Sequence, residues 1–125
     1  MIHVDTHVLV WLYAGARERF PESVADALSR ATLLYSPMVR LELAFLQEVG
    51  RIAVAPAVLL EDLAGRAGLR PAEASFERVT QVAASLTWTR DPFDRLIAAH
   101  ALADDLPLFS ADRSMLANCA VARWA

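Results

Sequence analysis

Short apolar stretches alternate with helix-like segments along the chain, and this alternation restricts the possible folds more than any other feature of the sequence. The apolar stretches are too short for helices, whereas the segments between them carry apolar residues at helical spacing. Short buried strands that alternate with helices of about 9–15 residues are typical of a parallel sheet with helices on both faces. The sequence therefore predicts an α/β fold, a three-layer α/β/α sandwich around a short-stranded, mainly parallel central sheet.

The element boundaries follow from breaks in these patterns and from residues that begin or end helices. We expect strands at residues 2–5, 33–35, 69–70, 106–109 and 121–124. We expect helices that start at Thr6 and that cover residues 22–30, 38–49, 57–67, 72–86 and 92–103, with a further turn at 112–116. The residues expected to face inward from helix 72–86 are Phe76, Val79, Val82 and Ala83. Helix 38–49 carries an apolar stripe formed by Leu41, Phe45, Leu46 and Val49.

Length and composition restrict the class of protein. With 125 residues, of which 56% are hydrophobic and 22% charged, the chain is expected to form a single domain over residues 1–125. No apolar run approaches the ~18–20 residues of a membrane span. His3 and Asp5 interrupt the N-terminal apolar stretch, so no signal peptide is expected, and a single cysteine excludes an internal disulfide. We therefore expect a cytoplasmic protein. Its net charge of −3 argues against a generic nucleic-acid binder, but not against an enzyme with metal ions at an acidic site.

Four acidic residues stand at junctions of the expected strands and helices. Asp5 and Asp112 lie at the carboxyl ends of strands, and Glu42 and Asp94 lie in the opening turns of helices. Right-handed crossovers bring the carboxyl ends of parallel strands to one edge of the sheet, so these acids can meet there. Neighbouring carboxylates raise each other's pKa, and a divalent cation removes that repulsion. The pattern therefore indicates a site for Mg²⁺ or Mn²⁺.

Each acid also has a purely structural explanation. Asp91 before Pro92 suits an N-cap, and Asp94 then falls at the third helical position, where a negative charge meets the helix dipole. Asp5 can cap the first helix, and Glu42 can be a solvated residue that pairs with a nearby arginine. A shared site is favoured over separate roles because the four acids occur at equally well-defined junctions.

Other chemically reactive side chains are better explained by packing. His3 and His7 belong to no recognisable metal-ligand spacing, so we expect them at packing or surface positions. Cys119 is interpreted as a small buried residue and not as a nucleophile. Trp88 is interpreted as a core residue and not as a platform for base stacking.

Four segments of the chain resemble the PIN domain, and within that family the VapC-type toxins of bacterial toxin–antitoxin pairs. They are residues 5–12, 36–43, 90–99 and 108–113, which follow the family's order across nearly the whole chain. The most specific match is Asp-Pro-Phe-Asp-Arg-Leu from Asp91, followed by Ser-x-Asp from Ser110. Residues 53–87 match only in pattern, so no substrate-contacting residue is assigned there.

The resemblance implies roles for the acids. Asp5, Glu42, Asp94 and Asp112 correspond to the family's acidic quartet, which is catalytic and binds the metal. Asp5, Asp94 and Asp112 are the expected direct ligands, whereas Glu42 is expected to bind through water or to orient the nucleophile.

The resemblance also implies roles for residues beside the acids. Thr6 and Ser110 are expected to orient the carboxylates. Asp91 is expected to cap the helix that carries the third acid of the quartet. Arg95 and Arg113 are candidates for contact with phosphate, although a solvated or ion-paired position is the commoner arrangement for such residues.

By the same resemblance, the protein is expected to be an endoribonuclease that depends on Mg²⁺ or Mn²⁺, in which a metal-activated water attacks an RNA phosphodiester. Its expected partners are RNA, a small antitoxin that lies across the acidic groove, and a second copy of the chain in a homodimer. The alternative is a PIN-like binding protein with a vestigial acidic site and no nuclease activity. A phosphatase with Asp5 as nucleophile is disfavoured, because the segment lacks the second Asp two residues on that haloacid-dehalogenase-type enzymes carry.

Overall fold

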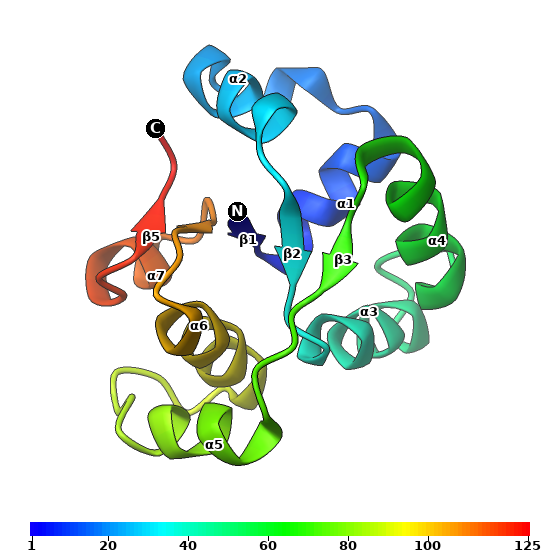
Figure 1. The fold of residues 1–125 in the computed structure, drawn as a ribbon. Helices are drawn as coiled ribbons and strands as arrows, with labels where there is room; N and C mark the ends of the chain where they lie inside the picture. The colour runs from blue at the N-terminus through cyan, green and yellow to red at the C-terminus, as the bar shows by residue number, and fades with distance from the viewer.

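A sheet of five parallel strands runs through the centre of the computed structural model, which describes residues 1–125 (Figure 1). The strands are β1 (Ile2–Val4), β2 (Leu33–Tyr35), β3 (Arg70–Pro71), β4 (Leu108–Phe109) and β5 (Ala122–Arg123). Their spatial order is β3-β2-β1-β4-β5, and every pairing is parallel, with Ile2 opposite Leu33 and His3 opposite Leu108. The predicted α/β fold with a parallel central sheet is therefore confirmed.

Seven α-helices surround this sheet. They are α1 (Thr6–Ala14), α2 (Glu22–Arg30), α3 (Met38–Glu48), α4 (Pro56–Ala67), α5 (Phe76–Ala84), α6 (Pro92–Asp104) and α7 (Arg113–Asn118), with a 3₁₀ turn at Arg17–Arg19. α5 packs along α6, whereas α1, α3 and α4 form a second group in which α3 also contacts α6 (Figure 1). None of the helices combines the length and the apolar character that crossing a membrane would require.

The middle strand, β1, lies at the centre of the hydrophobic core. All three of its residues are buried, which means that both faces of the strand are covered. The helices and the neighbouring strand add fully buried side chains, among them Leu9, Leu43, Ile97 and Leu108. Cys119 is buried and Trp88 packs against the core, as the sequence predicts. The residue that follows β1 is therefore attached to a strand that is buried on both faces.

The fifth helix is shorter than the sequence predicts. α5 begins at Phe76, because the Ser75 hydroxyl accepts the Arg78 N–H at 3.2 Å and so caps the helix there. Val79 and Ala83 are buried as predicted, but Phe76 is 73% exposed, so its predicted inward position is wrong. As the first residue of the helix, Phe76 shares a face with Val79 but lines an open cavity together with Leu96 of α6 instead of being covered.

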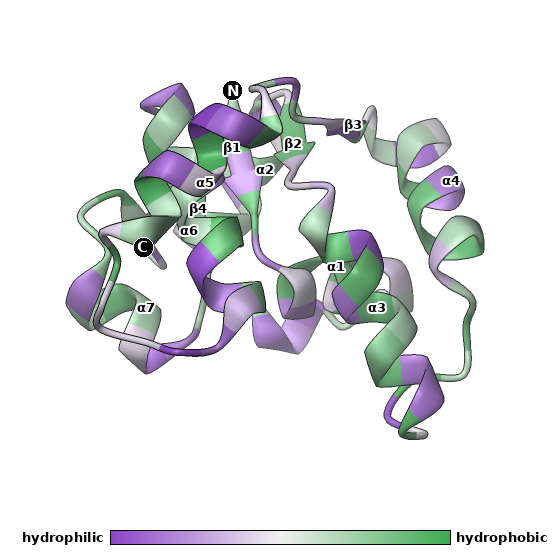
Figure 2. Ribbon diagram, turned by 90° about the horizontal axis from the view of Figure 1, so that it is seen from below, coloured by the Kyte–Doolittle hydropathy of each residue, from purple (hydrophilic) through white to green (hydrophobic).

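The apolar stripe on α3 faces solvent for most of its length. Leu41, Phe45 and Val49 are 57%, 47% and 53% exposed, whereas Val39 and Leu43 form the buried face of the same helix. Figure 2 shows the hydrophobic residues of α3 in green. A continuous apolar stripe on a surface is typical of contact with another protein.

Alanine substitutions on the two faces of α3 test this assignment. Because Leu43 is fully buried, L43A should lower the free energy of unfolding by about 2–5 kcal/mol. L41A, on the exposed face, should change that free energy by less than about 0.5 kcal/mol. Urea unfolding followed by circular dichroism measures both, and equal losses in the two variants would mean that α3 is packed differently.

Candidate functional site

Asp5 directly follows β1 and begins α1, and two hydrogen bonds hold its carboxylate. Oδ1 accepts the Thr6 N–H at 2.8 Å, which caps the helix, and Oδ2 accepts the Ser110 hydroxyl at 2.7 Å. Asp5 is only 4% exposed. Asp5 therefore lies at the end of a strand and also caps a helix, and the sequence predicts both positions.

Asp112 lies beside Asp5 because β1 and β4 are adjacent strands. The Asp5 N–H donates to the Phe109 carbonyl at 3.0 Å, and the loop after β4 then brings Ser110 to the Asp5 side chain. The Asp112 N–H donates to the Ser110 hydroxyl at 3.1 Å, while the Asp112 carboxylate caps α7 by accepting the Met115 N–H at 2.9 Å. Asp112 is exposed, so one side of its carboxylate faces solvent.

Glu42 reaches the same place from α3 and is partly buried. The Thr6 hydroxyl donates a hydrogen bond to its Oε1. Burial raises the pKa of Glu42 above its ordinary value; the Thr6 hydrogen bond opposes this shift, and the charges of Asp5, Asp91 and Asp112 add to it. The charges of these three acids therefore act on the Glu42 carboxyl group.

Asp94 is the third residue of α6, and no hydrogen bond contributes to the pKa of its carboxyl group. Its pKa is raised from the ordinary value of 3.8 to about 7. Burial is the largest cause, and four neighbouring carboxylates add to it: Asp91, Asp5, Asp112 and Glu42. The structure therefore brings together the four acids that the sequence places at separate junctions.

The residues predicted to support the acids contact them or their helices. The Thr6 and Ser110 hydroxyls donate to Glu42 and Asp5, respectively. Asp91 caps α6 by accepting the Phe93 N–H at 2.9 Å.

The two arginines considered for phosphate contact are placed differently. Arg95 donates from Nη2 to the Ala83 and Ala84 carbonyls, at 2.9 and 3.3 Å. It thus binds carbonyl groups at the C-terminal end of α5, a common use of arginine that we did not foresee from the sequence. Arg113, which follows Asp112, is exposed.

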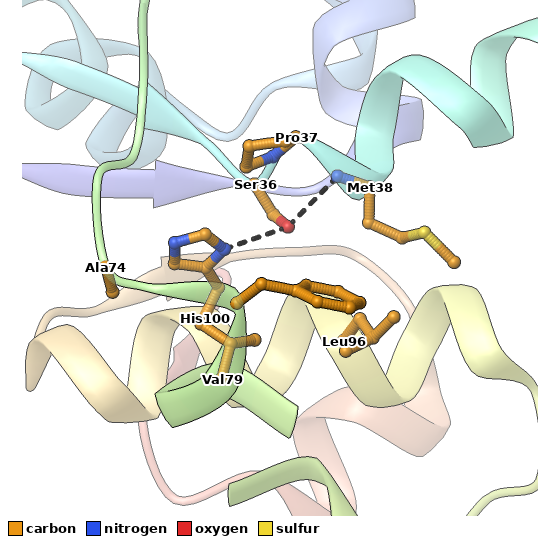
Figure 3. Close-up of a pocket in the computed structure, with 8 residues that line it drawn as sticks. Ser36, Pro37, Met38, Ala74, Val79, Leu96 and His100 are labelled. Atoms are coloured by element: carbon orange, nitrogen blue, oxygen red, sulfur yellow. Dashed lines mark hydrogen bonds between the residues drawn. The ribbon is translucent and has the colours of Figure 1, made fainter. Parts of the chain in front are cut away.

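A hydrogen-bonded pair fixes α3 relative to α6, the helices that carry Glu42 and Asp94. The Ser36 hydroxyl accepts the N–H of Met38, the first residue of α3, at 3.3 Å, and lies 3.1 Å from Nδ1 of His100 on α6 (Figure 3). Burial lowers the pKa of His100, so its ring is neutral at physiological pH. The pair also borders an apolar cavity of about 300 Å³ (Figure 3).

The acids suit a hard divalent cation in chemistry but do not form a ready-made coordination sphere. No group of three or more His, Cys, Asp or Glu residues is positioned as a set of metal ligands. However, the four acids offer carboxylate oxygens, which Mg²⁺ and Mn²⁺ prefer, and Asp94 has a raised pKa that a nearby cation would lower. The residues therefore fit such an ion.

The two N-terminal histidines have different roles. His3 is buried, with Nε2 at 2.6 Å from Oδ2 of Asp104, and burial lowers its pKa. His7 accepts the Ala111 N–H at Nε2 and lies beside Asp5. This contact was missed because a backbone amide 104 residues away leaves no signature in the sequence.

Comparison with known proteins identifies the family. The PIN domain family model matches residues 2–120, and the chain therefore belongs to the PIN domain family. No match to the sequence was found among curated proteins.

Solved structures of toxin–antitoxin complexes have the same fold. VapBC2 from Rickettsia felis bound to a DNA fragment from their promoter has a TM-score of 0.68 at 18% identity, covering 98% of this chain and 98% of that chain. VapBC-1 from nontypeable Haemophilus influenzae has a TM-score of 0.66 at 18% identity, covering 100% and 97% of the two chains. DNA-bound VapBC from Salmonella typhimurium has a TM-score of 0.63 at 19% identity, covering 99% and 98%. At these identities the likeness shows the fold alone.

The raised pKa of Asp94 predicts how stability depends on pH. Because the folded protein binds this proton more tightly than the unfolded chain, the contribution of Asp94 to stability is complete below pH 3.8 and is lost as the pH rises to about 7. Carboxyl ¹³C NMR should show Asp94 titrating near pH 7. In D94N, which has no ionisable group at this position, the free energy of unfolding should fall less between pH 3.8 and about pH 7 than it does in the wild type. A titration midpoint close to 3.8 would contradict the crowded site.

Proposed function

We propose that this PIN domain, residues 1–125 as one unit, is an endoribonuclease that depends on Mg²⁺ or Mn²⁺ and is the toxin of a VapBC-type toxin–antitoxin pair. The observation that carries the proposal is the gathering of Asp5, Glu42, Asp94 and Asp112, two of which have raised pKa values. Membership of the PIN domain family supports nuclease activity, and the similar solved structures are VapBC complexes.

The proposed metal site consists of the four acids. Asp5, Asp94 and Asp112 are the direct ligands, and Glu42 either binds through water or orients the attacking water. When bound, the ion supplies a water of lowered pKa and positive charge at the scissile phosphate. The chain supplies orientation: the Thr6 N–H and the Ser110 hydroxyl engage both oxygens of Asp5, so its carboxylate cannot rotate freely.

Glu42 is the proposed acceptor for the proton of the attacking water. The Thr6 hydroxyl occupies Oε1, which leaves Oε2 available for that proton. Burial raises the pKa of Glu42, and a stronger base is better suited to this transfer near neutral pH. The water oxygen forms the new bond to phosphorus, and the bond to the 3′ oxygen of the preceding nucleotide breaks. The leaving oxygen takes up a proton from solvent, which balances the proton that Glu42 accepts.

The proposed protein partners are a small antitoxin and a second copy of the chain. The exposed stripe of Leu41, Phe45 and Val49 supports contact with another protein, because water-exposed apolar surface is stabilised when a partner covers it. A peptide that places arginine against the acids would block the site by charge pairing. Because the proposed substrate is cellular RNA, we propose that the protein acts in the cytoplasm.

Substitution of the acids tests the proposed activity. D94N and D5N should fold and should lower the Mn²⁺-dependent cleavage of total RNA by at least ~10²-fold, because each removes a charge that holds the ion. D105N is the matched control: Asp105 lies at the other end of α6, in the left-handed region that asparagine also tolerates. Cleavage at the wild-type rate by both D5N and D94N would exclude the proposed site.

The second candidate function is a binding protein with a vestigial acidic site. One observation favours it: Asp5, Asp91 and Asp112 all cap helices, and no ready-made set of metal ligands is present. In the cleavage assay this alternative predicts that the wild type is as inactive as D94N.

A further inference from the structure

His7 connects the two segments that carry Asp5 and Asp112. It is the second residue of α1, and its side chain is 33% exposed. Nε2 accepts the Ala111 N–H at 3.0 Å, and Nδ1 lies 3.7 Å from Oδ2 of Asp5. Because a backbone amide only donates, Nε2 holds a lone pair, and the proton of the neutral ring is on Nδ1, on the side of Asp5.

Ala111 is the middle residue of the loop between β4 and α7. Its neighbours already contact the site: Ser110 donates to Asp5 at 2.7 Å and accepts the Asp112 N–H at 3.1 Å. The bond from Ala111 to His7 ties the middle of the same loop to α1. Without an acceptor at His7, the Ala111 N–H would lose this partner, and Asp112 would be freer to move relative to Asp5.

The imidazole ring is also held on its other side. Trp11, one turn further along α1, packs edge-on against it, with 4.9 Å between ring centroids. Trp11 in turn contacts Phe20 and Trp124. Trp124 follows β5, and in that strand the Arg123 carbonyl accepts the Ser110 N–H at 3.1 Å. The His7 ring is thus held between an aromatic cluster and the loop, so it can in turn hold the loop in place.

We propose that His7 is a positioning residue of the acidic site: by accepting the Ala111 N–H, it holds Asp112 where Asp112 acts together with Asp5. This inference builds on the proposed nuclease function and assigns a role to a residue for which the sequence indicates only packing or a surface position. His7 acts through a lone pair, so another acceptor at this place should replace it. Misplacement of a reacting or orienting group by about 1 Å lowers a rate by up to ~10²-fold.

The variants H7Q and H7L separate this role from a general effect on folding. Glutamine offers an amide oxygen near the place of Nε2, whereas leucine has similar bulk and no acceptor. H7L should lower kcat for Mn²⁺-dependent RNA cleavage by ~10²-fold with KM changed by less than about threefold, and H7Q should keep at least ~tenfold more of kcat than H7L. By NMR, the Ala111 amide proton should exchange with solvent faster in H7L than in the wild type or H7Q. S23L, which places leucine at the second position of α2, is the matched control and should change none of these quantities.

Each outcome bears on His7. If H7L keeps the wild-type kcat and the wild-type exchange of Ala111, the proposal is overturned. The proposal is also overturned if H7Q loses as much activity as H7L, because a hydrogen-bond acceptor at position 7 would then not be enough to hold the loop. Thermal melting of both variants shows whether lower stability accounts for their lower activity. If the wild type cleaves no RNA, the proposed nuclease function fails, whereas the exchange of the Ala111 amide still confirms or overturns the contact that His7 makes.

Discussion

Repulsion among carboxylates crowded at the carboxyl ends of β1 and β4 is the interaction on which the rest of this structure depends. Burial adds a separate cost, which is the largest single cause of the raised pKa of Asp94, because a carboxylate removed from water loses much of its favourable hydration. Asp94 shows the effect most clearly, with a pKa raised to about 7. Groups that repel one another stay together only where covalent and hydrogen-bonded structure holds them. The fully buried central strand and the helix starts beside it provide that structure.

Three of the acids are held by the backbone of the helices that they begin. Asp5, Asp91 and Asp112 accept N–H groups at the starts of α1, α6 and α7, where the helix dipole also favours negative charge. Glu42 and Asp94, whose pKa values are raised, cap no helix. The structural and the chemical explanations of the acids are therefore compatible. Capping fixes Asp5, Asp91 and Asp112 in place, and their charges help to raise the pKa values of Glu42 and Asp94. A bound cation would lower these two pKa values again.

The places of the acids could be predicted because they depend on local signals. An apolar run followed by an aspartate, or an Asp-Pro pair, indicates a strand end or a helix start almost independently of the rest of the chain. Long-range contacts could not be predicted in this way. Phe76 has the periodicity of an inward residue but is exposed, because periodicity shows which residues share a face and not what covers that face. The partners of Arg95 and His7 are backbone atoms, which carry no side-chain signature, and 104 residues separate His7 from Ala111.

Because these carboxylates are close together only in the folded protein, the folded protein should bind a divalent cation more tightly than the unfolded chain does. The most direct measurement is the free energy of unfolding at neutral pH as Mn²⁺ is raised at constant ionic strength, for the wild type and for D94N. The free energy of unfolding of the wild type should rise as Mn²⁺ saturates the site, by about 2.7 kcal/mol when the Mn²⁺ concentration is about 100 times Kd. The free energy of unfolding of D94N should rise much less. No rise in the wild type, or an equal rise in D94N, would contradict a cation site built from these acids.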